Sequence, residues 1–393
     1  MSLNPVDYLR IIEGLEKEGR LRTLNHGNAS GLLDCTSNDY MAIGADAHLQ
    51  KEFLEECLGK QFNREQSVHL MGSCSSRLLY TSLPNPYGEL EEYLKTLYGR
   101  ETLLFNSGYH TNVGLIQAIA KRDTLIVSDS LIHASAIDGI RLSKAPYRIF
   151  PHNDIPALET ILKEESLNYS QILLIVESVY SMDGDIAPLA EFVSLKERFS
   201  NLLLYIDEAH AFGIRGSRGL GLCEELQLLD SVDIIVCTLS KAAASIGAFV
   251  VVNDTLKKYL VNTARSLIFS TALPPVNILW SAFIVKRLLT MHEKRQRLQQ
   301  ISRDIASIIG TLTGRNMEEH TTPIVPFMIG GNHRVVRASE IMREHGVLTL
   351  PIRKPTVAEG TERLRISLNA AMTDADIQSL RKASEIVASE LLH

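Results

Sequence analysis

The chain has 393 residues, of which 45% are hydrophobic and 22% charged, proportions that are ordinary for a globular protein with a sizeable core. A formal net charge of −6 provides no basic field for nucleic acid or anionic lipid, and no apolar run approaches the length of a bilayer span. The odd number of cysteines and the lack of a C-x-x-C pair argue against a zinc site and favour free thiols in a reducing, cytoplasmic setting.

The first twenty residues have the pattern of a charged, amphipathic helix and lack the uninterrupted apolar segment of a signal peptide. No repeat or long linker follows. We expect an N-terminal arm over residues 1–45, a large domain over 46–280 and a smaller domain over 281–393.

The middle of the chain alternates short apolar runs with helix-like segments. Most of these runs are apolar throughout, which is typical of parallel strands covered by helices on both faces. The candidate strands begin at Glu101, Asp123, Tyr147, Gln171, Asn201, Val232 and Gly247. Several end in polar residues, which line the crevice where open α/β sheets bind ligands. The sequence therefore predicts an α/β fold with a mostly parallel sheet.

The pattern changes after residue 275. The segment VNILWSAFIVKRLLTMHEKRQRLQQISRDIASIIGTL predicts one long helix. Strand-like TPIVPFMIG and RLRISLN follow, and a final helix is expected to begin after Thr373 as its N-terminal cap. This mixture predicts a smaller α+β domain at the C-terminal end.

The stretch LLLYIDEAHAFG ends an apolar run with Asp-Glu-Ala-His, a run also found in ATP-driven motors. A motor needs a phosphate loop of the form G-x-x-x-x-G-K-[ST] upstream. The nearest candidate, CLGKQF, lacks both the first glycine and the hydroxyl residue. The motor interpretation therefore fails.

Two consecutive strand ends carry Asp207 and Lys241 towards the same crevice. A lysine that forms a Schiff base, together with a carboxylate that keeps a pyridine nitrogen protonated, is what pyridoxal phosphate (PLP) requires. A buried ion pair, or two unrelated loop residues, would give the same spacing. The pattern alone leaves both interpretations open.

Other strand ends add to the PLP hypothesis. Asn106, Ser107 and Gly108 stand between a strand and a helix, where backbone N–H groups can bind a phosphate, although a simple turn is the alternative. His133 could lie flat on a pyridine ring, but a lone histidine is more often just a satisfied polar residue. Ser181 could reach the ring, or it could simply belong to the turn formed by the MDGD segment.

An ordered set of segments resembles the α-oxoamine synthases of the fold-type I PLP superfamily. The segments are SNDY, FNSGYHTNVG, IHASAIDGIR, ESVYSMDGDIAPL, DEAHAFGIRG, TLSK, FSTALPP and PTVAEGTERLRISL. The resemblance extends from about Ser37 to the C-terminal end. It implies a fold-type I transferase, PLP as the cofactor and a homodimer with shared active sites.

The resemblance also implies roles for individual residues around the cofactor. Lys241 is expected to form the Schiff base, and Asp207 to pair with the pyridine nitrogen. His210, assisted by Ser181, is expected to bind the phenolic oxygen, and His133 to stack on the ring and contact substrate. The implied phosphate-binding residues are Ser107, Gly108, Tyr109 and Thr238, with Ser270 and Thr271 reaching the phosphate of the partner subunit.

The family's reaction is a decarboxylative condensation of a small amino acid with an acyl-CoA or acyl-carrier thioester. Arg365 is expected to hold the amino-acid carboxylate, which a guanidinium can grip at two points. Asn38 and Thr356 are expected to line the substrate site. Arg22 is the expected N-terminal substrate-binding arginine, with Arg20 as the alternative.

The segment PTVAEGTERLRISL is most similar to members that join L-alanine to pimeloyl-CoA in biotin synthesis. Members that use glycine with an acetyl group, serine with a palmitoyl group, or long acyl chains remain alternatives. A non-catalytic homologue and an aminotransferase of the same fold are the competing classes. The aminotransferase would lack the STALPP and PTVAEGT segments.

The sequence departs from the family in the region expected to shape the acyl channel and the dimer interface. The family's GSGGSR is here GSCSSR, with Cys74 and Ser75. Tyr87 stands about where a histidine is expected, and His110 is unusual. These departures leave the acyl partner as the most open part of the assignment.

Overall fold

The computed structural model describes residues 5–22, 24, 30–59, 69–81 and 85–392. The chain divides into two compact units. Unit 1 comprises Met1–Tyr40, Ser181–Asp185 and Gln296–His393, and unit 2 comprises Met41–Tyr180 and Ile186–Arg295. The division into an arm, a large domain and a small domain stays a prediction.

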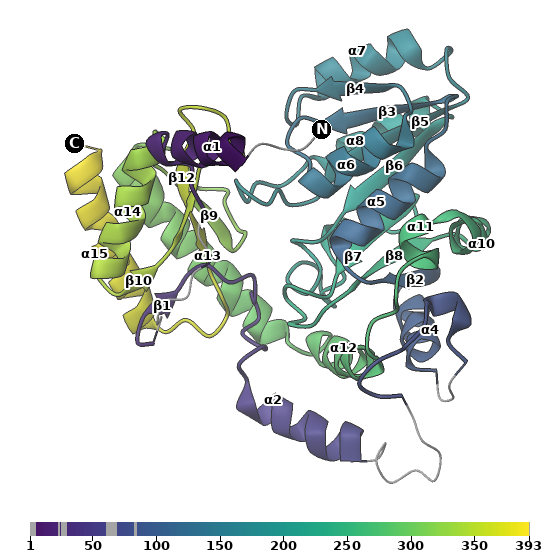
Figure 1. Cartoon of the computed structure of the whole chain (residues 1–393), viewed down its shortest axis with the longest axis horizontal. Helices are drawn as coiled ribbons and strands as arrows, with labels where there is room; N and C mark the ends of the chain where they lie inside the picture. Colours follow the sequence, from purple (N-terminus) through teal and green to yellow (C-terminus); the bar gives the residue numbers. More distant parts are fainter. Residues whose placement is uncertain (1–4, 23, 25–29, 60–68, 82–84, 393) are drawn as a thin grey trace. The chain divides into compact units, whose positions relative to one another are not determined.

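Unit 2 is built around a seven-stranded sheet in the order β2-β8-β7-β6-β5-β3-β4 (Figure 1). The strands are β2 (Glu101–Phe105), β3 (Thr124–Asp129), β4 (Tyr147–Phe150), β5 (Gln171–Glu177), β6 (Leu202–Asp207), β7 (Ile234–Thr238) and β8 (Ala248–Val252). The five strands β4, β3, β5, β6 and β7 are parallel to one another, whereas β8 is antiparallel to both β7 and β2. The seven candidate strands and the mostly parallel sheet are therefore confirmed.

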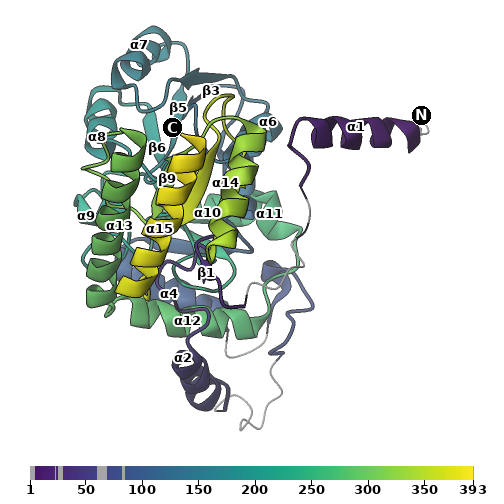
Figure 2. The same cartoon turned by 90° about the vertical axis from the view of Figure 1, so that its left-hand side faces the viewer.

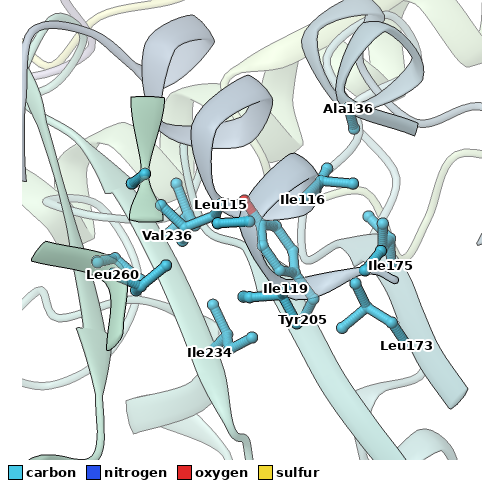
Figure 3. Packing of buried hydrophobic residues seen from close by; sticks show 14 of the residues in the cluster. Leu115, Ile116, Ile119, Ala136, Leu173, Ile175, Tyr205, Ile234, Val236 and Leu260 are labelled. Carbon is cyan, nitrogen blue, oxygen red and sulfur yellow. The ribbon is translucent and has the colours of Figure 1, made fainter. Parts of the chain in front are cut away.

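Helices bury both faces of this sheet. On one face, Leu115 and Ile119 of a helix pack in the same cluster as Ile175, Tyr205 and other strand residues (Figure 3). Strand residues of the opposite face, such as Ile206, are buried as well. The apolar runs are continuous because each strand lies between two layers. The main helices of unit 2 are α4 (Pro86–Tyr98), α5 (Gly108–Ile119), α6 (Ala134–Ser143), α7 (Ile155–Glu165), α8 (Leu189–Arg198), α10 (Asp254–Thr263) and α12 (Pro275–Leu288).

Shorter helical segments complete unit 2. They are α2 (Ala47–Glu52), a π-helical stretch at Phe53–Leu58, a 3₁₀ turn at Arg77–Leu79, α9 (Leu222–Glu225) and α11 (Arg265–Ile268). Because these segments span at most two turns, their positions depend on packing more than on intrinsic helix stability.

Unit 1 contains a three-stranded antiparallel sheet in the order β11 (Leu350–Ile352), β12 (Arg363–Ser367) and β9 (Ile324–Met328). A short parallel pair joins β1 (Leu33–Asp34) to β10 (Val347–Leu348). Its helices are α1 (Pro5–Lys17), most of α13 (His292–Thr313), α14 (Asn332–Glu344) and α15 (Asp374–Leu391), and the last two lie side by side (Figure 2). Thr373 caps α15 in a capping box with Asp376, as the sequence predicted.

The single long helix expected after residue 275 is wrong, because the segment forms two helices. Helix α12 ends at Leu288, and α13 (His292–Thr313) begins four residues later. Both the N–H and the hydroxyl of Thr290 donate to the Arg287 carbonyl, at 3.0 and 2.9 Å. This tight turn ends α12 without a glycine or proline to mark it. Within the described residues, no helix is long and apolar enough to cross a membrane.

Candidate active site

The ends of β6 and β7 bring together the acidic and basic residues predicted for the site. Asp207 is the last residue of β6 and lies opposite Val236 of β7 in the parallel register. Lys241 follows three residues after Thr238, the last residue of β7. Its Nζ lies 2.7 Å from Nε2 of His210, which is buried in the turn after β6. Lysine, imidazole and carboxylate thus come from adjoining strand ends, because neighbouring parallel strands end at one edge.

Asp207 is 8% exposed and accepts two hydrogen bonds. Its Oδ2 accepts from Asn112 Nδ2 at 2.8 Å, and its Oδ1 accepts from the Ala209 N–H at 2.9 Å. Glu177 of β5 stands directly opposite Asp207. Burial, and then the charge of Asp207, raise the pKa of Glu177 well above its usual range. The raised pKa favours the neutral form of Glu177 beside Asp207.

The N-terminus of α5 has the character of a phosphate site. Ser107 caps this helix by accepting from the His110 N–H, and its Oγ lies 2.8 Å from His110 Nδ1. The first N–H groups of the helix, at Gly108 and Tyr109, have no acceptor within the helix. A Cβ added to Gly108 would lie 3.8 Å from Thr238 Oγ1, so the turn and the end of β7 adjoin. Helix N–H groups beside a hydroxyl suit a dianion.

Ser270 and Thr271 lie close to this turn within the same chain. Asn106 Nδ2 donates to Ser270 Oγ at 2.8 Å and to the Thr271 carbonyl at 2.7 Å. The Ala272 N–H donates to the carbonyl of Ser75, one of the residues that depart from the family pattern. The contribution of Ser270 and Thr271 to a partner's site stays a prediction.

His133 caps the N-terminus of α6 through its side chain. Its Nδ1 accepts from the Ser135 N–H at 3.2 Å and lies 2.7 Å from Ser135 Oγ. Desolvation lowers the pKa of His133, and the charge of Lys241 adds to this, whereas Asp207 acts in the opposite direction. The imidazole is therefore neutral at physiological pH.

Unit 1 holds the predicted carboxylate-binding arginine. Arg365 lies on β12 and is 4% exposed. Its guanidinium donates to the Ser181 carbonyl (2.6 Å), Ser367 Oγ (2.6 Å), Asn38 Oδ1 (3.0 Å) and Tyr40 Oη (3.3 Å). Among the described residues these acceptors are all neutral. A buried cation without a carboxylate partner is a site that an anionic ligand stabilises.

The remaining predicted substrate residues are also in unit 1. Arg22 Nη2 donates to Thr356 Oγ1 at 2.8 Å, so these two predicted residues are in contact. Arg20 instead forms an ion pair with Glu18 at 2.7 Å. This geometry favours Arg22 over Arg20 for a substrate. Ser181 contacts Arg365 through its backbone oxygen, and its predicted contact with a cofactor stays a prediction.

Two of the positions that depart from the family pattern, Cys74 and Tyr87, have distinct surroundings in the structure. Cys74 has a φ of +53°, a left-handed conformation that glycine adopts without strain, which accounts for the family's glycine at this position. Tyr87 is buried at the start of α4, where its hydroxyl donates to the Leu273 carbonyl. The centroids of the Tyr87 and Tyr80 rings are 4.9 Å apart in an edge-on arrangement. Burial raises the pKa of Tyr87 to about 12. Tyr87 therefore fixes the FSTALPP segment at Leu273.

Asn112 and Tyr40 were missed by sequence reasoning. Asn112 follows Gly108 by one helical turn, which places it on the same side of α5 as the phosphate-binding turn. Tyr40 follows Asn38 by two residues, and its hydroxyl donates to Asn38 Oδ1 at 3.1 Å. The distance along the sequence from a predicted residue was the available signal in both cases. Neither distance distinguishes these residues from their neighbours.

Comparisons with known proteins agree with this arrangement. Residues 43–383 match the family described as aminotransferase class I and II. An 8-amino-7-oxononanoate synthase from Haemophilus ducreyi is 41% identical over 354 residues, which are 89% of this chain and 90% of that protein. The structure of serine palmitoyltransferase from Sphingomonas wittichii is 26% identical and covers 99% of this chain and 98% of its own, with a TM-score of 0.85. A structure of SPT with PLP is also 26% identical, with a TM-score of 0.85 and coverage of 98% and 97%.

Proposed function

Because this chain belongs to the aminotransferase class I and II family, as a fold-type I, PLP-dependent acyltransferase of the α-oxoamine synthase group, we propose that it condenses L-alanine with pimeloyl-CoA. Carbon dioxide and CoA are released, and the product is 8-amino-7-oxononanoate, as in biotin synthesis. The observation that supports these substrates most strongly is the 41% identity with the Haemophilus ducreyi enzyme over about nine-tenths of both chains.

The residues of unit 2 fit the cofactor. We assign Lys241 Nζ to covalent attachment, Asp207 to the pyridine nitrogen and His210 to the phenolic oxygen. The N-terminus of α5 and the Thr238 hydroxyl would hold its phosphate. When bound, PLP supplies an electron sink that makes a bond at the amino-acid Cα easier to break. The chain's own contribution is orientation and charge, because these groups lie on strand ends and a helix terminus that packing holds in place.

Arg365 binds the carboxylate of the amino acid. A carboxylate that accepts two N–H bonds from a guanidinium is fixed in position and in plane, which limits the orientations that the rest of the amino acid can adopt. Lys241 Nζ accepts the Cα proton, and the imidazole of His210, 2.7 Å away, keeps this amine close to the strand ends. Asn38, Thr356 and Arg22 complete the proposed substrate contacts.

Serine with palmitoyl-CoA is a second candidate, because serine palmitoyltransferase from Sphingomonas wittichii covers 99% of this chain. The lower identity of 26% makes it the weaker candidate. A homodimer with shared sites, completed by Ser270 and Thr271, and a cytoplasmic location belong to the same proposal.

The test is a matrix of alanine, glycine and serine against acetyl-CoA, pimeloyl-CoA and palmitoyl-CoA. Thiol release and carbon dioxide release are measured together. We expect alanine with pimeloyl-CoA to give the highest kcat/KM, with equal yields of thiol and carbon dioxide. A higher value for glycine with acetyl-CoA, or for serine with palmitoyl-CoA, would refute the proposed substrates.

A further inference from the structure

A continuous set of hydrogen bonds connects Asp207 to His133 through two other side chains. Asn112 Nδ2 donates both to Asp207 Oδ2 (2.8 Å) and to Ser135 Oγ (2.9 Å), and Ser135 Oγ lies 2.7 Å from His133 Nδ1. Tyr205 donates its hydroxyl proton to Asn112 Oδ1 at 2.6 Å. Asn112 and Ser135 are buried, and the ring of Tyr205 is held in the apolar cluster (Figure 3).

The direction of each bond follows from what each group can donate. The carboxylate of Asp207 only accepts, so the Asn112 amide must direct its NH₂ group towards it. The same nitrogen has a second N–H, which it gives to Ser135 Oγ. Ser135 therefore has its one proton left for His133 Nδ1. The backbone N–H of Ser135 also donates to this Nδ1, at 3.2 Å. Both contacts require a lone pair on Nδ1, so the ring proton must be on Nε2.

We propose that Asn112 and Ser135 are positioning residues that hold His133 as the neutral tautomer with its proton on Nε2. The proposal deepens, and rests on, the proposed function, in which His133 faces the cofactor and the substrate. Asp207 thus acts at two places: it supplies charge to the pyridine nitrogen, and through two side chains it decides which nitrogen of His133 carries the proton.

The consequence is a ring with one defined polar group on its free side. In this tautomer Nε2 donates a hydrogen bond and cannot accept one. His133 can therefore donate a hydrogen bond to a carboxylate or carbonyl oxygen of the substrate. It cannot bind an ammonium group in this way, because both groups would be donors. The lowered pKa of His133 agrees with this, because protonation of Nδ1 would break both bonds from Ser135.

Nitrogen NMR of the full-length chain, with ¹⁵N-labelled histidine side chains, tests the tautomer directly. The signals of His133 are assigned by their loss in His133→Gln, and spectra are recorded near pH 7.5 with and without added PLP. We expect an unprotonated Nδ1 and a protonated Nε2 in both. A proton on Nδ1, or an equal mixture of tautomers, would overturn the proposal, and this measurement needs no variant beyond the one used for assignment.

Ser135→Ala tests the positioning role, with Ser143→Ala as the control. Ser143 lies on the same helix, and its hydroxyl donates to the Ile140 carbonyl. Ser135→Ala should move the ratio of tautomers about fivefold towards Nδ1–H, the effect of losing one ordinary hydrogen bond. Ser143→Ala should leave the ratio unchanged. An unchanged ratio in Ser135→Ala, or an equal shift in both variants, would refute the role of Ser135.

The kinetic readout separates this proposal from the proposed function. Ser135→Ala should raise KM for the amino acid severalfold and leave KM for the acyl thioester within about twofold, since one substrate loses a defined donor. If the unmodified chain releases neither thiol nor carbon dioxide while His133 keeps its proton on Nε2, the proposed function fails and the tautomer assignment stands. If turnover is normal while the proton is on Nδ1, the tautomer assignment fails and the proposed function stands.

Discussion

Gly184→Ala should destabilise the chain more than an ordinary surface substitution. Gly184 has a φ of +69°, a backbone conformation that favours glycine. A Cβ at this position would lie 2.0 Å from the Ile324 carbonyl oxygen and 2.7 Å from Thr322 Oγ1. The Thr322 hydroxyl also donates to the Gly184 carbonyl at 2.5 Å, so the turn and the start of β9 are in direct contact. The Ile324 carbonyl cannot rotate away as a flexible side chain could.

The expected loss is the sum of two effects. A non-glycine residue in the left-handed region costs about 1–2 kcal/mol. Forcing extra atoms into a filled site costs about 1–3 kcal/mol more. The free energy of unfolding should therefore fall by about 2–5 kcal/mol, a large part of the roughly 5–15 kcal/mol that stabilises a typical protein. Because Gly184 lies three residues after Ser181, whose carbonyl binds Arg365, KM for the amino acid should also rise.

Urea unfolding followed by circular dichroism measures the change, and Gly360→Ala is the matched control. Gly360 has a φ of +82°, but a Cβ there would meet no heavy atom within 4 Å. Its substitution should cost only the backbone part, about 1–2 kcal/mol. Equal losses in the two variants would refute the reasoning, because the contact with the Ile324 carbonyl would then contribute nothing.

Four other outcomes are expected. Lys241→Ala should abolish thiol release without lowering the thermal unfolding midpoint appreciably, because this side chain lies outside the core; turnover in the variant would contradict the assignment. Arg365→Ala should raise KM for the amino acid at least tenfold, since a charge-assisted bond is worth about 1.5–3 kcal/mol, and should change KM for the acyl thioester much less. Lys241→Ala and Thr271→Ala chains, mixed and allowed to exchange subunits, should regain activity, because one site of a mixed dimer carries neither substitution; no regain would refute shared sites. Burial raises the pKa of Glu177 in the folded protein, so the stability that this carboxyl contributes is complete below its unfolded pKa of about 4.3 and is lost as pH rises further. Glutamine does not ionise, so Glu177→Gln should stabilise the protein increasingly above about pH 4.3. Unfolding at pH 4 and pH 8 checks this, and an equal difference at both pH values would contradict it.

The sheet of unit 2 could be predicted from sequence because a strand buried on both faces shows as an uninterrupted apolar run. The residues at its ends could be predicted too, since β6 and β7 end at the same edge and bring Asp207 and the lysine of TLSK together. The break between α12 and α13 could not, because Thr290 closes the turn with its own hydroxyl and the apolar spacing continues across it. Asn112 could not either, because its role depends on Asp207 and Ser135, 95 and 23 residues away in the chain.

The neutral acceptors around Arg365 also affect how a simple anion could compete for this guanidinium. A guanidinium has five N–H groups. Four of them are used by Ser181, Ser367, Asn38 and Tyr40. Chloride from the buffer would have to displace at least one of these bonds to make a second contact, and as a single atom it cannot present two acceptor atoms to the guanidinium. A planar carboxylate replaces the lost bonds with two of its own. If Arg365 binds the substrate carboxylate as proposed, chloride should therefore compete with that carboxylate only weakly.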